Sequence, residues 1–191
     1  MPRSTSPADL VINWIQIQLG WAAGPRTILW PRFTTRETDM ILGVHHPALA
    51  VPDIQRAIDF YCGVLGFAQV MSADIPSGIE PMNRAFGIDD AGCKVRMIKK
   101  GNSCIELFEF AKGESGEAKR PVNRHGITHL ALATDDYQKD YDHLVAHGVR
   151  FNTAPMGETP SRWAYGRDPF GNVIELLENL PGSPTALRFG E

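Results

Sequence analysis

The chain has few cysteines, no long apolar run and no cluster of basic residues. Its three cysteines, Cys62, Cys93 and Cys104, are an odd number without metal-ligand spacing. They argue against a disulfide framework and favour reduced, buried thiols in a cytoplasmic protein. No apolar run reaches the roughly 18–20 residues that a membrane span needs. The net charge is −3 without a run of Lys or Arg, so we expect neither a nucleic acid nor a membrane as partner.

What the chain does contain is typical of a globular protein. Its 191 residues are 43% hydrophobic and 21% charged, enough for a core in one domain or two small modules. Residues 1–39 fit this pattern poorly, and their single early basic residue, Arg3, makes a signal peptide a weak interpretation. We expect a poorly ordered extension or a start codon assigned upstream of Met40. A helix that packs on a partner subunit is a third interpretation.

The first expected module, 41–110, has the order strand, helix and three strands. The expected strands are 41–51, 68–71, 94–98 and 104–110, and a helix follows the N-cap Asp53. Residues 72–92 are rich in Pro, Gly, Ser and Asp. We predict a long loop there, and a loop of this length inside a compact domain is often functional, for instance as a lid.

A polar linker, 111–123, leads to a second module, 124–178, with the same order of elements, and a tail follows at 179–191. The expected strands are 126–134, 149–151, 162–167 and 173–177, and the expected helix is capped by Asp135 or Asp136. The two modules therefore form an internal repeat. The offset from His46 to His129 is 129 − 46 = 83, and that from Glu106 to Glu175 is 175 − 106 = 69. We expect the two modules to pair about a pseudo-twofold axis.

In each module a histidine opens the first strand and a glutamate lies within the last. Strand alternation puts each glutamate on the face opposite its apolar neighbours, where a carboxylate is costly unless it is paired or binds a cation. Pseudo-symmetry then predicts that His46, Glu106, His129 and Glu175 meet. Two imidazoles and two carboxylates suit one divalent ion, Zn, Ni, Co, Mn or Fe, with room for water or substrate.

Each of these residues also has a purely structural interpretation. His46 alone is more often a core histidine than a ligand, and the two glutamates can face solvent. His45 is expected on the opposite strand face and outside the site, while Glu109 and Glu178 are expected to face water or cap strand ends. A pocket for an anionic or aromatic substrate is expected to involve some of five further residues. These are Arg84, Arg96, Arg162, Trp163 and Tyr165.

Several motifs carry a family resemblance. They are H-x₄-V-x-D from His46, F-Y-x₃-L-G-F from Phe60, I-E-L-F-E-F, H-L-A-L-A-T-D-D and D-P-F-G-N-V-I-E-L. Over 41–178 the chain resembles the vicinal oxygen chelate superfamily of glyoxalase I, methylmalonyl-CoA epimerase, extradiol dioxygenases and bleomycin or fosfomycin resistance proteins. The resemblance implies an α+β fold of two βαβββ modules that form a half-open barrel around a metal. It also places His46, Glu106, His129 and Glu175 at the four ligand positions of the lyase and isomerase members.

The predicted function is a glyoxalase-like lyase, isomerase or epimerase that depends on a divalent metal. It would act on a small α-hydroxycarbonyl substrate through a metal-bound enediolate, with Glu106 or Glu175 as general base and acid. One alternative is a ring-cleaving extradiol dioxygenase with Fe or Mn, and another is a resistance-type binding protein without catalysis. We expect a homodimer. The sequence leaves open whether the modules pair within one chain or between two.

Overall fold

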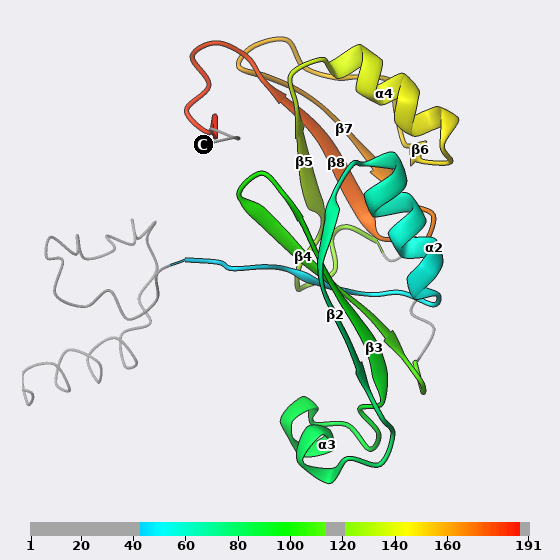
Figure 1. Ribbon diagram of the computed structural model, residues 1–191. Helices are drawn as coiled ribbons and strands as arrows, with labels where there is room; N and C mark the ends of the chain where they lie inside the picture. Colours follow the sequence, from blue (N-terminus) through cyan, green and yellow to red (C-terminus); the bar gives the residue numbers. More distant parts are fainter. Residues whose placement is uncertain (1–42, 114–120, 188–191) are drawn as a thin grey trace, which may run out of the picture. The chain divides into compact units, whose positions relative to one another are not determined.

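The computed structural model describes residues 43–113 and 121–187, which form two open four-stranded sheets (Figure 1). The strand orders are β1-β4-β3-β2 and β5-β8-β7-β6, with one parallel pair in each sheet. The predicted α+β fold of two βαβββ modules with half-open sheets is confirmed. The expected extension 1–39, the middle of the linker and the end of the tail lie outside the described residues.

The first module contains four strands and two helical segments. Its elements are β1 (Ala48–Ala50), α2 (Ile54–Ile58) with η2 (Asp59–Val64), β2 (Ala68–Ile75), α3 (Glu80–Phe86), β3 (Cys93–Lys100) and β4 (Ser103–Phe110). The described part of the first strand is shorter than expected and begins after Pro47. The loop prediction for 72–92 was wrong at two places, because β2 continues to Ile75 and α3 lies inside the segment.

The predicted helix after Asp53 begins where expected, since the Asp53 carboxylate accepts a hydrogen bond of 3.0 Å from the Arg56 amide. It is an α-helix for one and a half turns and continues as the π-helix η2. The wider turn buries two consecutive aromatic residues, Phe60 and Tyr61. Both of these side chains contact the second module, as described below.

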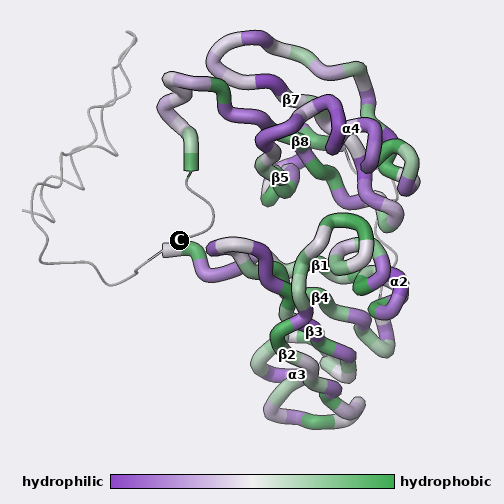
Figure 2. Tube along the Cα trace, turned by 45° about the horizontal axis from the view of Figure 1, so that its top comes forward, coloured by the Kyte–Doolittle hydropathy of each residue, from purple (hydrophilic) through white to green (hydrophobic). Residues whose placement is uncertain are grey.

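The second module repeats the order of the first without the inserted helix. Its elements are β5 (Leu130–Thr134), α4 (Tyr137–Ala146), β6 (Arg150–Phe151), β7 (Ser161–Arg167) and β8 (Val173–Asn179). Asp136 is the N-cap of α4. This helix is mostly hydrophilic in Figure 2, and it contributes the buried residues Tyr137 and Leu144 to the hydrophobic core. Of the two caps left open by the sequence, the structure therefore selects Asp136.

One buried polar contact joins the two modules. The Tyr61 hydroxyl donates a 2.8 Å hydrogen bond to Asp168, and neither residue is more than 4% exposed. The same carboxylate accepts bonds from the amides of Phe170 and Asn172 and from the Asn172 side chain. Burial, and then the charge of Asp168, raises the pKa of Tyr61 far above its ordinary value. The turn that leads into β8 is therefore fixed to the helix of the first module.

Two further sequence predictions concern cysteines and membranes. All three cysteines are free thiols, with Cys93 buried and Cys62 and Cys104 half-buried. Burial raises the pKa of the Cys93 thiol, which suits a structural role. Within the described ranges, no helix has the length and apolar character required to cross a membrane.

Candidate functional site

The parallel pairing of β1 with β4 brings His46 beside Glu106. The Glu106 amide donates a 3.0 Å hydrogen bond to the Pro47 carbonyl, and Ala48 lies opposite Glu106 in the ladder. As a result, His46 Nε2 lies 3.2 Å from Glu106 Oε2. We call these two residues the first pair.

The second module builds the same arrangement from β5 and β8. Leu130 lies opposite Ile174, so His129, which immediately precedes β5, reaches Glu175 on β8. His129 Nε2 lies 3.0 Å from Glu175 Oε2. We call these residues the second pair. Two strand pairs that are far apart in the sequence thus produce the same contact.

Both pairs have a donor set that suits a divalent cation. Two ligands held at right angles about 2.1 Å from one ion lie roughly 3 Å apart, which is the separation seen in each pair. The side chains are 29% and 19% exposed in the first pair and 28% and 13% exposed in the second. All four side chains are therefore half-buried and keep some contact with solvent.

The four predicted ligands do not meet within one described chain. Among residues 43–113 and 121–187, no three His, Cys, Asp or Glu side chains converge on a point that could hold a metal. Each module therefore presents half of the predicted ligand set. A complete set requires the other half from elsewhere.

The face of the first sheet that carries Glu106 is lined by apolar and aromatic side chains. Phe108 and Phe110 follow Glu106 at alternate positions of β4 and share its face, and Met97 lies directly opposite Glu106 on β3. Phe108 and Phe110 stack at 5.3 Å between ring centroids. Phe86 from α3 contacts both rings at 5.9 and 6.0 Å and is 38% exposed. The helix within 72–92 therefore adds an aromatic residue to this wall.

Two of the predicted pocket residues, Trp163 and Tyr165, lie on the face that carries Glu175. Tyr165 is directly opposite Glu175 in the ladder, and its ring meets His129 edge-on at 5.0 Å. Trp163 contacts Tyr165 at 5.5 Å. Burial, then the charge of Glu175 and a hydrogen bond to it, raises the pKa of Tyr165. Tyr165 thus contacts both members of the second pair.

The three predicted pocket arginines lie elsewhere and pair with carboxylates. Arg84 on α3 pairs with Glu80, and both side chains are well exposed. Arg96 pairs with Asp74 at 2.8 Å and lies opposite Leu107, on the helix-facing side of its sheet. Arg162 lies opposite Glu178 on the corresponding side of the second sheet and pairs with it at 3.4 Å. The structure does not bring these guanidinium groups to either pair.

The regular strand that was expected to turn His45 away from His46 is absent at these two residues. Both residues precede β1, and their Nδ1 atoms are 2.7 Å apart. Sequence reasoning also missed a role of Glu109, whose carboxylate accepts 2.7 Å bonds from the Ile54 amide and the Lys94 ammonium group. The alternation of side chains along β4 could have indicated this role, because it puts Glu109 on the helix-facing side of the sheet with Ile105 and Leu107.

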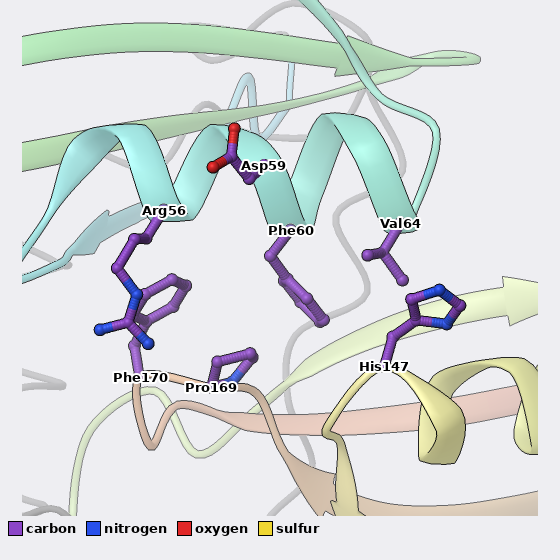
Figure 3. A pocket seen from close by; sticks show the side chains of 7 residues that line it. All are labelled: Arg56, Asp59, Phe60, Val64, His147, Pro169 and Phe170. Atoms are coloured by element: carbon purple, nitrogen blue, oxygen red, sulfur yellow. The ribbon is translucent and has the colours of Figure 1, made fainter.

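A cavity of about 260 Å³ lies outside both pairs, between the α2–η2 helix and the turn before β8 (Figure 3). Phe60 and Phe170 meet edge-on across it at 6.5 Å, and the Arg56 guanidinium lies 5.9 Å from the Phe170 ring centroid. None of the predicted ligands lines this cavity. It marks the contact between the modules rather than the predicted site.

Comparison with known proteins agrees with this architecture. Residues 43–176 match the model of the Glyoxalase/Bleomycin resistance protein/Dioxygenase superfamily. The chain belongs to this superfamily. It is 30% identical over 152 residues to a 2-epi-5-epi-valiolone epimerase of Actinomyces sp, covering 75% of this chain and 82% of the relative. It is 27% identical over 135 residues to a probable lactoylglutathione lyase of Synechocystis sp., covering 70% of this chain and 92% of the relative.

A solved glyoxalase family protein from Bacillus cereus has the same fold. The TM-score is 0.67 at 22% sequence identity, and the match covers 76% of this chain and 99% of the other. At this identity the likeness supports the fold alone. The superfamily membership and its isomerase-type and lyase-type relatives set the class of chemistry to consider for the two pairs.

Proposed function

We propose that this protein is a divalent-metal-dependent lyase or isomerase that acts on a small α-hydroxycarbonyl compound through an enediolate. The observation that carries the proposal is the repeated contact between a histidine Nε2 and a glutamate Oε2, at 3.2 Å in one module and 3.0 Å in the other. The epimerase and the lyase among the relatives support the same class of reaction.

His46, Glu106, His129 and Glu175 would hold the ion. When bound, a divalent ion supplies Lewis acidity, which makes the proton on the carbon beside the substrate carbonyl easier to remove. The protein must then supply a group that takes this proton and returns it. A glutamate carboxylate at the edge of the site is suited to both tasks.

We assign the proton transfer to Glu106 rather than Glu175. Tyr165 hydrogen-bonds Glu175 and lies directly opposite it, which restrains that carboxylate. Glu106 faces Met97, a side chain that donates no hydrogen bond. Glu106 therefore has fewer restraints and can turn toward the substrate, while Glu175 keeps its position.

We also propose that two copies of the chain complete each site. Within the described part of the chain each pair holds half of the ligand set. A twofold dimer that sets the first pair of one copy against the second pair of the other would form two equivalent sites. Homodimerisation is then a requirement for metal binding.

The lining of the two faces supports a substrate with an apolar or aromatic group beside its hydroxycarbonyl oxygens. Phe108, Phe110 and Phe86 follow Glu106 along one wall, and Trp163 and Tyr165 stand beside Glu175 on the other. The predicted pocket arginines pair with carboxylates at other places. An aryl hydroxyketone such as 2-hydroxyacetophenone fits this lining better than a phosphorylated compound.

The test combines metal analysis with solvent-deuterium exchange. The purified protein is analysed for bound metal and then incubated in D₂O with 2-hydroxyacetophenone or with acetoin. The proposal predicts metal-dependent deuterium incorporation at the hydroxyl-bearing carbon, faster for the aryl compound. Oxygen uptake with catechols and no exchange would instead support the dioxygenase. Tight ligand binding without any bound metal would support the resistance-type binding protein.

A further inference from the structure

The residue immediately before each histidine of the two pairs contacts the other nitrogen of that ring. His45 Nδ1 lies 2.7 Å from His46 Nδ1, and Thr128 Oγ1 lies 2.7 Å from His129 Nδ1. His45 and Thr128 are themselves related by the repeat offset, since 45 + 83 = 128. The two modules therefore place different polar groups at the same position relative to the ring.

This contact determines which ring nitrogen is available as a ligand. A neutral imidazole carries its proton on one nitrogen and a lone pair on the other. In both rings it is Nε2 that faces the glutamate, so Nε2 must carry the lone pair when a cation is bound. Nδ1 must then carry the proton and needs an acceptor, and such acceptors orient metal-binding histidines in general.

We propose that His45 and Thr128 are positioning residues, which hold the Nδ1 proton of His46 and His129 and leave Nε2 free to bind the metal. The inference rests on the proposed function only in assuming that a divalent ion is bound. It assigns a role to two residues that are not among the four predicted ligands. It also explains why an exposed histidine packs edge-on against His46, with 5.0 Å between ring centroids.

The two positioning residues differ in the restraint that they impose. The Thr128 hydroxyl can rotate and either accept or donate, so it accommodates both proton positions of His129. His45 accepts at Nδ1 only when its own proton is on Nε2. Replacing His45 by threonine should therefore be the conservative change, because the second module already uses threonine at this position.

The test measures zinc affinity of the full-length chain by competition with a chromogenic chelator. We expect His45→Ala and Thr128→Ala each to weaken zinc binding roughly 10- to 100-fold, the usual effect of losing an acceptor behind a ligand histidine. His45→Thr and Thr128→Ser should restore most of the affinity. His125→Ala, which replaces an exposed histidine outside both pairs, is the control and should bind zinc like the wild type.

A second measurement separates positioning from a general loss of structure. In the zinc-loaded wild type, long-range ¹H–¹⁵N spectra should show a hydrogen-bonded Nδ1 proton on His46 that exchanges slowly with water. His45→Ala should lose this signal and His45→Thr should recover it, with the circular dichroism spectrum unchanged in all three proteins.

The outcomes distinguish this inference from the proposed function. If His45→Ala binds zinc as tightly as the wild type, or if His45→Thr binds as weakly as His45→Ala, the positioning role is overturned. If zinc affinities follow the expected order but no deuterium exchange occurs, the inference stands and the proposed reaction is wrong. A wild-type chain that binds no divalent ion would overturn both.

Discussion

The first and second pairs have the same geometry but different surroundings. Their Nε2–Oε2 separations are 3.2 and 3.0 Å. Glu175 faces a tyrosine that hydrogen-bonds it, whereas Glu106 faces a methionine and is followed by two stacked phenylalanines. A repeated module has thus kept its strand pairing while the side chains across the ladder have changed.

This difference suggests how two similar glutamates can take separate roles. A carboxylate that accepts a hydrogen bond from a neighbouring strand keeps its position, and one beside apolar groups is free to move. On our account the second pair serves mainly as an anchor. The first pair combines metal binding with proton transfer.

The largest expected effect comes from replacing the glutamates one at a time. Glu106→Gln should lower the rate of deuterium exchange by roughly 10²–10⁴-fold, because it removes the proposed proton carrier. Glu175→Gln should act mainly by weakening metal binding, so added metal should recover a large part of its rate. The comparison fails if excess metal rescues Glu106→Gln and leaves Glu175→Gln inactive.

A second test concerns the buried hydrogen bond between the modules, which has no counterpart at the repeat-related position. Tyr61 donates to the buried Asp168, while the residue at the repeat-related position of Tyr61 is the apolar Leu144. Tyr61→Phe leaves a buried carboxylate short of one donor and should cost about 2 kcal/mol of unfolding free energy. In thermal unfolding this corresponds to a fall of roughly 4–8 °C in Tm.

The matched control is Tyr141→Phe, which removes a hydroxyl that donates to the Thr153 carbonyl in an exposed contact. It should change Tm by less than half as much. Equal effects of the two variants would mean that the Tyr61–Asp168 bond contributes no more than a surface hydrogen bond.

A third test addresses the aromatic cluster of Phe86, Phe108 and Phe110, in which Phe86 comes from the helix α3. Phe86→Ala should raise KM for an aryl hydroxyketone roughly three- to tenfold, the range expected from losing one aromatic contact. KM for acetoin and the bound metal should stay unchanged. Ile88→Ala alters another exposed apolar residue just after α3 and serves as control. Equal changes for both substrates would remove Phe86 from the specificity argument.

The smallest expected effect concerns Glu109, which accepts a hydrogen bond from the first residue of α2. The Lys94 ammonium group and the Ile54 amide lower the pKa of Glu109, so its charged form is favoured in the folded chain. Because the folded pKa is depressed, this stabilisation is present above the unfolded pKa and is lost as pH falls through the folded value.

Glu109→Gln should therefore lower Tm at pH 7 and approach the wild-type Tm in acid. Glu178, at the repeat-related position, pairs with Arg162 at 3.4 Å through an Oε2 that accepts no hydrogen bond, and Glu178→Gln is the matched variant. Differential scanning calorimetry between pH 3 and pH 7 checks both variants. A Glu109→Gln difference that is constant over this range would contradict the assignment.

Much of the fold was predictable because its signals are local and repeated. The caps Asp53 and Asp136 and the alternation of β4 and β8 each specify a structure within a few residues. The repeat predicted that His46, Glu106, His129 and Glu175 meet, and the described residues show each histidine beside the glutamate of its own module. Alternation also predicted that Glu106 and Glu175 lie on the face opposite their apolar strand neighbours, which are the buried residues of β4 and β8.

The parts that sequence reasoning missed depend on irregular backbone or on distant contacts. His45 meets His46 because the chain before β1 is not a regular strand, so alternation did not apply. The helix α3 lies in a segment rich in Gly, Pro and Ser, where local propensity favours a loop. Arg96 and Arg162 were predicted to line a pocket, but each pairs with a carboxylate on a neighbouring strand, and that pairing depends on strand register. Arg84 instead pairs with Glu80 one turn earlier in α3.

We propose that the first pair of one copy and the second pair of another form one metal site. Two double variants test it, His46→Ala/Glu106→Gln and His129→Ala/Glu175→Gln, each lacking one pair in every copy. The account predicts that neither variant alone binds zinc tightly. After the two are unfolded and refolded together, about one quarter of the wild-type zinc should return, since half of the dimers are mixed and each holds one intact site. Mixed dimers that regain no zinc would contradict the claim.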